Sequence, residues 1–192
     1  LDPKVKEIKA TQYRVASNSG VVNALINARR NGKKVTVFVE VKARFDEYAN
    51  LQFAKTMKKT GIQIIYSIPG LKVHAKIALV LRKSSGGRKT EYAFLSTGNF
   101  NEKTAKIYAD HGLFTCNENI CSELKEVFGY LENQQRDLNL KHLLVAQFNI
   151  KKELSRKINR EIRNAKAGKP AWMVLKMNGI DHKKMIDKLV RG

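Results

Sequence analysis

A histidine and a lysine two residues apart, His74 and Lys76, are the residues of this sequence best suited to chemistry. They follow a turn signal at Pro69-Gly70, and the apolar residues after them predict a strand from His74 to Arg82. Side chains two apart on a strand share a face, so both should point the same way. A neutral imidazole can attack or hold a phosphoryl group, and an ammonium supplies a compact positive charge for its oxygens. A lone strand histidine is more often structural than catalytic, so the surrounding residues must decide.

Two arginines follow predicted strands and could add to such a site. Arg14 lies at the end of the run Val5–Val15, and Arg44 lies just beyond Lys34–Val41. Ligands in α/β sheets bind beyond the carboxyl ends of parallel strands, and two guanidiniums there would form a fork for phosphate oxygens. An equally weighted alternative is that the arginines pair with nearby acids, such as Glu40, Asp46 and Asp110.

A small polar loop, Thr97-Gly98-Asn99, precedes a short helix expected near Asn101 or Glu102. A loop of small residues at a helix N-terminus can bind an anion, and Asn99 could donate to a phosphate or orient the imidazole. An ordinary Gly-Asn turn is the favoured interpretation without further context. The histidines and cysteines have no metal-like spacing, and no Walker A or Gly-x-Gly-x-x-Gly pattern occurs.

The elements that must position these residues alternate between strand and helix up to residue 67. This pattern predicts a parallel sheet with right-handed crossovers and helices on its faces. A hairpin, a further strand and a further helix follow. The expected strands are 5–15, 34–41, 62–67, 74–82, 89–96 and 108–115, and the expected helices are about 21–30, 46–60 and 118–131.

The residues from 133 to 141 are polar and uneven, and they are expected to link two domains. We assign residues 1–148 to a first domain and 149–192 to the beginning of a second one, with a basic helix 151–167, a strand 172–177 and a helix 181–189. The predicted class is α/β: a mixed, mainly parallel sheet flanked by helices, plus the incomplete start of a second α/β domain. The final residues lack a packing partner and the first residue is Leu1, so we expect a fragment of a longer protein.

The charge balance points to a polyanionic partner. The 192 residues hold 37 Lys and Arg against 17 Asp and Glu, a formal net charge of +20. Such an excess suits nucleic acid, an anionic membrane or another phosphate polymer, although a merely basic surface could account for half of it. No apolar run is long enough to span a membrane. The two cysteines, Cys116 and Cys121, match neither CxxC nor a disulfide framework, which indicates a reducing cytoplasm.

Four segments in order resemble one known family. His74-x-Lys76 followed by Gly98-Asn99 looks like half of a phospholipase D superfamily site, in which histidine is the phosphoryl-accepting nucleophile, although Leu81 stands where that motif has an aspartate. More specifically, the chain is similar over nearly its whole length to bacterial polyphosphate kinase of the long-chain-synthesising type. The segments that carry this resemblance are Tyr13–Ala16, Val39–Glu47, Pro69–Lys76 and Thr97–Ala105.

The resemblance implies a role for each matched position. His74 would form the phosphohistidine, Arg14 and Arg44 would lie at the phosphates and magnesium, and Tyr108 would lie against the adenine of ATP. Because a guanidinium cannot plausibly ligate a cation, we expect any Mg²⁺ contact of the two arginines to run through phosphate oxygens or water. The family also implies ATP or ADP and inorganic polyphosphate as substrates, no nucleic acid partner, homo-oligomers of the full-length protein, and a cytoplasmic location with occasional peripheral membrane association.

The expected function is therefore reversible transfer of the terminal phosphate of ATP to polyphosphate through a phosphohistidine, with the chain alone inactive because the family's second essential histidine is absent from these residues. The runner-up is half of a phospholipase D-type phosphodiesterase or nuclease, which Leu81 and the two arginines argue against. The third is a basic module that binds nucleic acid. That reading is weakened by the absence of any known nucleic-acid-binding motif.

Overall fold

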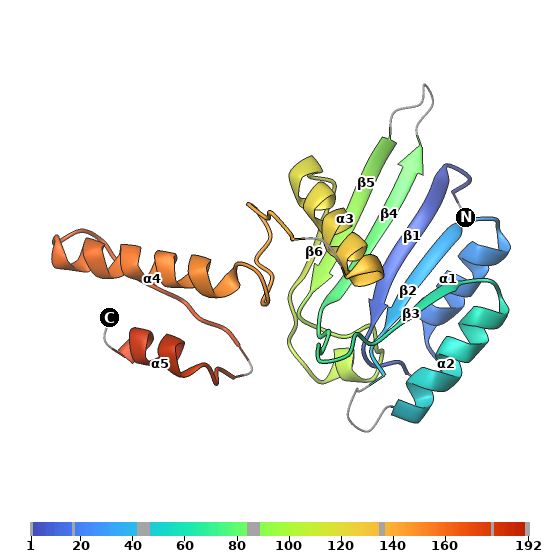
Figure 1. Ribbon diagram of the computed structural model, residues 1–192, viewed down its shortest axis with the longest axis horizontal. Coiled ribbons are helices and arrows are strands. Elements are labelled where there is room, and N and C mark those ends of the chain that lie inside the picture. Colours follow the sequence, from blue (N-terminus) through green and yellow to red (C-terminus); the bar gives the residue numbers. More distant parts are fainter. Residues whose placement is uncertain are drawn as a thin grey trace. The chain divides into compact units, whose positions relative to one another are not determined.

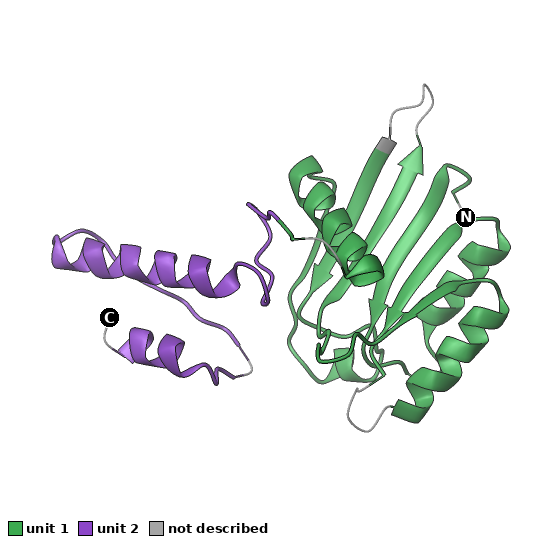
Figure 2. Ribbon diagram, in the orientation of Figure 1, with its two compact units in different colours: residues 1–138 green, residues 139–192 purple. Residues whose placement is uncertain are grey.

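The computed structural model describes residues 2–16, 18–41, 47–83, 89–134, 137–177 and 179–190. Two compact units divide the chain, residues 1–138 and residues 139–192 (Figure 2). Arg44 lies outside the described residues. The domain assignment with its division at residue 148 stays a prediction.

The first unit is built on a six-stranded sheet in the order β3-β2-β1-β4-β5-β6 (Figure 1). β1, β2 and β3 pair in parallel, whereas the described pairings β1–β4, β4–β5 and β5–β6 are antiparallel. The α/β class with a mixed sheet flanked by helices is thus confirmed, and parallel pairing is confined to the first three strands. The strands are β1 Val5–Gln12, β2 Lys34–Val39, β3 Gln63–Tyr66, β4 Lys76–Lys83, β5 Lys89–Ser96 and β6 Gly112–Thr115.

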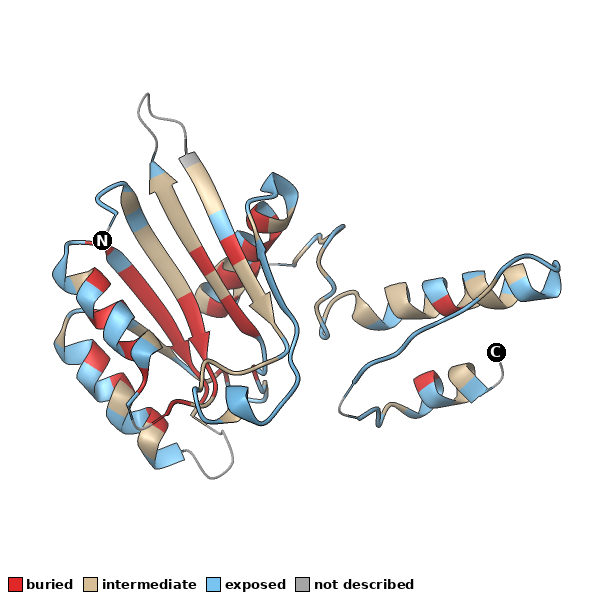
Figure 3. Cartoon of the chain, turned by 180° about the vertical axis from the view of Figure 1, so that it is seen from behind, coloured by how far each residue is buried: buried red, intermediate tan, exposed pale blue. Residues whose placement is uncertain are grey.

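Helices α1 (Gly20–Arg30) and α2 (Glu47–Lys59) cover one face of β1, β2 and β3. Ser19 begins α1 by accepting a hydrogen bond from the Val22 amide on its side chain. Apolar side chains of both helices interlock with the β-branched residues of β2, and buried residues line this interface in Figure 3. The members of this core that are most fully enclosed are Val37, Val39, Ala54 and Met57.

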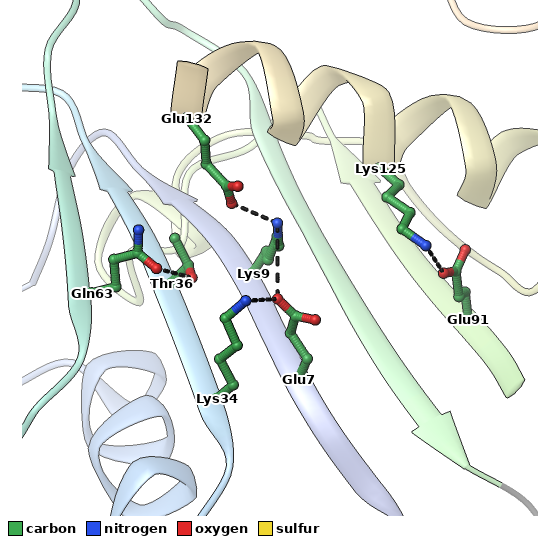
Figure 4. Close-up of polar contacts among 8 residues, drawn as sticks. All are labelled: Glu7, Lys9, Lys34, Thr36, Gln63, Glu91, Lys125 and Glu132. Carbon is green, nitrogen blue, oxygen red and sulfur yellow. Dashed lines mark hydrogen bonds and ion pairs between the residues drawn. The ribbon is translucent and has the colours of Figure 1, made fainter.

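Helix α3 (Glu118–Asn133) packs on the opposite face, against β4 and β5. Its buried apolar residues recur at helical spacing: Cys121, Leu124, Val127, Phe128 and Leu131. Ion pairs join this helix to the sheet, Glu132 with Lys9 of β1 and Lys125 with Glu91 of β5 (Figure 4). Helices thus pack on both faces of the sheet, α1 and α2 over its parallel half and α3 over β4 and β5.

Several expected strands differ from the structure. The strand predicted over 108–115 begins only at Gly112, and the one predicted over 5–15 ends at Gln12. The strand predicted from His74 begins at Lys76, because the backbone around His74 is bonded to side chains instead of a neighbouring strand. The strand predicted over 172–177 does not form: the described residues there have no strand partner, and an apolar run becomes a strand only where another strand can pair with it. The short helix near Asn101 is a single 3₁₀ turn, Thr104–Lys106.

The second unit contains α4 (Ile150–Lys166) and α5 (Lys183–Val190). The side chain of Asn149 ties the segment before α4 together by donating to the carbonyls of Leu140 and Leu143. Apolar side chains stay exposed beside α4, among them Trp172 and Val174. Across the described parts of both units, no helix is long and apolar enough to cross a bilayer.

Candidate functional site

The parallel strands deliver several polar residues to one edge of the sheet. Tyr13 and Arg14 follow β1, and Glu40 follows β2. β4 runs antiparallel to β1, so β4 begins at the edge where β1 ends. The loop 67–75 leads from β3 into β4 along this edge, and it carries His74. The topology thus brings residues from three distant segments to the carboxyl ends of the parallel strands, where α/β proteins bind ligands.

His74 and Lys76 lie against each other at this edge. The Lys76 Nζ is 2.9 Å from each ring nitrogen of His74, and it donates to the His74 carbonyl oxygen at 2.7 Å. Lys76 is buried, whereas His74 is exposed. The two side chains therefore lie together, as predicted, although His74 precedes the strand instead of belonging to it. An exposed imidazole over a buried ammonium is accessible to an incoming phosphoryl group.

Tyr13 is the centre around which the charges gather. Its ring meets the His74 ring edge to face, with centroids 4.4 Å apart and planes at 86°. Among the described residues, three cations lie within 6 Å of the Tyr13 ring centroid, Lys76 Nζ at 5.0 Å, Lys72 Nζ at 5.8 Å and Arg14 Cζ at 5.9 Å. The negative face of an aromatic ring attracts cations, so Tyr13 helps to hold like charges together.

The surroundings keep the histidine neutral. Loss of hydration against its neighbours lowers the pKa of His74, and the positive charges of Lys76, Lys72 and Arg14 lower it further. Burial, together with Arg14, lowers the pKa of Lys76 to about 8, while Asp110 acts in the opposite direction. The imidazole is thus available as a nucleophile at neutral pH, beside an ammonium that remains mostly charged.

The loop after β5 reaches the same region through Asp110. Ser96 pairs with Lys76 in the sheet, and the loop that follows carries Asn99. The Thr97 hydroxyl donates to Asp110 at 3.0 Å, and Gly98 lies so close to Asp110 that a β-carbon would stand 2.6 Å from the carboxyl carbon. The Asn99 Oδ1 is buried without a hydrogen-bond partner among the described residues, so it could accept from a ligand or water.

The structure brings some of the sequence-predicted site residues together and not others. His74, Lys76 and Arg14 come together around Tyr13, and Asn99 lies in the loop that Asp110 connects to Lys76. Tyr108 is 63% exposed after the 3₁₀ turn, and Arg44 lies outside the described residues.

Sequence reasoning gave no site role to Tyr13 or Lys72. Both lie in the segments that carry the family resemblance, one directly before Arg14 and the other two residues before His74. Their position next to predicted site residues is the feature of the sequence that could have indicated a role for them.

The described residues do not fit direct coordination of a magnesium ion. Mg²⁺ prefers oxygen ligands in octahedral geometry. The charged groups that act on His74 are cationic, and no cluster of three histidine, cysteine or acidic residues that could hold a metal occurs in the described part of the chain. A magnesium ion would have to arrive on the phosphate oxygens of a nucleotide.

Comparison with known proteins gives two consecutive family matches. Residues 1–137 match the model of polyphosphate kinase C-terminal domain 1, and residues 143–192 match that of polyphosphate kinase C-terminal domain 2. The first match alone covers well over half of the chain.

Individual relatives agree over the whole length of this chain. Polyphosphate kinases of Vibrio vulnificus and Escherichia coli K12 are 45% and 44% identical to it over 189 residues, which is 98% of the chain. The crystal structure of polyphosphate kinase from Porphyromonas gingivalis is 48% identical and superposes with a TM-score of 0.86 over 100% of the chain. The chain spans only 27% of the length of those Vibrio and Escherichia relatives, and 32% of the crystallised one.

Proposed function

This chain belongs to the polyphosphate kinase family, and we propose on that premise that it carries the phosphoryl-accepting histidine of a reversible ATP:polyphosphate phosphotransferase. The observation that carries the proposal is the exposed imidazole of His74 among Lys76, Lys72 and Arg14, which lower its pKa. Such a group is a neutral nucleophile inside a positive field. That combination suits attack on a phosphate anion.

In the first step, a ring nitrogen of His74 forms a bond to the terminal phosphorus of ATP. The bond from that phosphorus to the bridging oxygen breaks in line, and ADP leaves with the electron pair. In the second step, a terminal oxygen of polyphosphate attacks the same phosphorus, the nitrogen–phosphorus bond breaks, and the free imidazole returns. Run backwards, the two steps make ATP from ADP.

The transition state of this transfer needs positioning and charge neutralisation more than proton transfer. Lys76 and Arg14 would face the phosphate oxygens, together with Arg44 and Asn99 as the sequence motifs predict. Tyr108, exposed as it is, has a free ring face for stacking against adenine. Magnesium enters the proposal only with the nucleotide, since the cations around His74 leave no ligand set for it.

The family's other properties remain predictions for this chain, namely homo-oligomerisation, a cytoplasmic location and the absence of nucleic acid partners. Activity of the whole protein is also a proposal, because these residues are about a quarter of a relative's length.

The decisive experiment labels a protein of the relatives' full length that carries this sequence with ATP bearing a labelled γ-phosphate. We expect an acid-labile, base-stable phosphoprotein, and His74→Ala should abolish it because the accepting nitrogen is gone. His142→Ala, which also removes an exposed histidine, is the matched control and should label normally. Label retained in His74→Ala would reject the assignment. Cleavage of a chromogenic phosphodiester by the same protein would instead support the phospholipase D-type alternative.

A further inference from the structure

The loop that carries His74 is fastened by buried side chains on both sides of this residue. Before it, the Val73 amide donates to Glu40 Oε2 at 2.9 Å. After it, the Ala75 carbonyl accepts from the Thr11 hydroxyl at 2.8 Å. Glu40 and Thr11 are 1% and 2% exposed. The backbone is therefore fixed immediately before and immediately after an imidazole that itself reaches solvent.

Glu40 makes this attachment from within a larger network. Its second oxygen, Oε1, accepts from the Ser67 hydroxyl at 2.6 Å, and the Ser67 oxygen accepts from the Val41 amide at 2.7 Å. The carboxylate therefore ties the end of β2 to both ends of the loop 67–75. Burying a carboxylate is costly unless hydrogen-bond donors satisfy it. Here Ser67 and Val73 supply those donors, and the resulting network fixes the position of the loop 67–75.

Asn50 of α2 joins the nucleophile's neighbours to the same network. It is 0% exposed, and its Nδ2 donates to the carbonyls of Tyr13 at 2.8 Å and Glu40 at 3.0 Å. Tyr13 in turn contacts the His74 ring. Asn50 thus connects α2 to the backbone of Tyr13 directly, and to the backbone beside His74 through Glu40.

We propose that Glu40 is a positioning residue for phosphoryl transfer: it holds the Val73 amide and so fixes the His74 imidazole for in-line attack. This inference rests on the proposed function of His74. Glu40 touches neither nucleotide nor phosphate in this scheme, so it should act on the rate of His74 phosphorylation and not on ATP affinity. Displacement of a reacting group by roughly 1 Å can cost about 100-fold in rate.

Two substitutions of nearly equal size separate hydrogen bonding from bulk. Glu40→Gln keeps a carbonyl oxygen for the Val73 amide, and its NH₂ group can donate to the Ser67 oxygen, which has lone pairs to accept it. Glu40→Met has a side chain of the same length but offers the amide no oxygen. Single-turnover labelling of the full-length protein with γ-labelled ATP would measure the maximal rate constant and the ATP concentration at half of it.

We expect Glu40→Met to lower the maximal rate constant of phosphohistidine formation by about 100-fold. The half-saturating ATP concentration should stay within about twofold of the wild-type value, and Glu40→Gln should recover most of the rate. Thr36→Val is the matched control, because Thr36 is 2% exposed and donates to Gln63 at 3.2 Å in the same sheet without contacting the loop. It should lower the melting temperature and leave the rate constant unchanged.

The result that overturns the proposal is Glu40→Met labelling at the wild-type rate, or a loss confined to ATP affinity. If Glu40→Met does not fold, Ser67→Ala decides, because it removes one donor to the carboxylate and should slow labelling several-fold. These failures differ from failure of the proposed function. In that case the wild-type protein would form no label at His74 at all.

Discussion

At the scale of single residues, the site works by surrounding one imidazole with charges of one sign. Lys76, Lys72 and Arg14 all disfavour a proton on His74, and their mutual repulsion is offset in part by the Tyr13 ring, which all three approach. In the free protein such a cluster is costly. In the proposed reaction a bound phosphate would relieve this repulsion, so the charges that keep His74 unprotonated would also favour the substrate.

The lowered pKa values predict a bell-shaped pH profile for kcat/KM. His74 must be unprotonated, and its lowered pKa places the acid limb below the ordinary histidine value of 6.5. Lys76 must be protonated, and its pKa of about 8 places the alkaline limb near pH 8. Lys76→Arg should move the alkaline limb upward, because a guanidinium keeps its charge. Initial rates of ADP release across this range would test both limbs.

An acid limb above pH 6.5 would contradict the electrostatic argument. So would an alkaline limb that Lys76→Arg leaves in place, even if that variant is slower overall. The lowered pKa values also predict how protein stability depends on pH. Both groups bind protons more weakly in the folded state, so the free energy of unfolding should rise as the pH increases through the range between their folded and unfolded pKa values.

At the scale of elements, local patterns predicted the first half of the sheet well. The helices expected over 21–30 and 46–60 and the strand expected over 34–41 all form, as the spacing of their apolar residues indicates. Arg14 and Arg44 were predicted to meet His74 at one edge of the sheet, because parallel strand ends share an edge, and Arg14 lies there beside Tyr13. These inferences needed only neighbouring residues and one rule of topology.

The errors and omissions concern bonds between distant residues. The strand expected over 172–177 would need a partner strand, and the apolar pattern cannot supply one. The start of β4 shifted from His74 to Lys76 because the loop backbone bonds to Thr11 and Glu40, which lie more than thirty residues away. The sequence suggested Glu40 only as one possible partner for an arginine, which stays a prediction. Its role in holding the loop depends on burial that no local pattern reveals.

The loop after β5 allows a test with a matched pair of glycines. A β-carbon at Gly98 would stand 2.6 Å from Asp110 Cγ, whereas one at Gly129 in α3 meets no atom within 4 Å. Gly98→Ala should displace the loop or Asp110, lowering both the melting temperature and the rate of labelling. Gly129→Ala should raise stability by about 1 kcal/mol, since alanine is the better helix former. Thermal unfolding and labelling of both variants would show whether the close approach at Gly98 matters; equal behaviour would argue against it.

At the scale of the whole molecule, a net charge of +20 without a recognisable motif for reading nucleic acid bases favours a partner that is recognised by its charge alone. A polyphosphate chain offers closely spaced charges and nothing else to recognise. A basic surface binds it by releasing counterions, so affinity should fall linearly with salt on logarithmic axes. DNA offers the same kind of charge, but on a wide double helix whose phosphates are spaced and shaped differently from those of a single polyphosphate chain.

Competition between the two polyanions therefore separates a phosphotransferase site from a general basic surface. We expect long polyphosphate to displace labelled duplex DNA from the full-length protein at a lower phosphate concentration than DNA requires to displace polyphosphate.

Lys72→Ala should weaken polyphosphate binding more than DNA binding, because Lys72 is one of the cations around His74. Lys34→Ala is the matched control: its exposed ammonium pairs with Glu7 of the sheet, so it should affect both ligands equally and little. Fluorescence anisotropy at several salt concentrations would give both affinities and slopes, and equal displacement in both directions would favour the nucleic acid alternative.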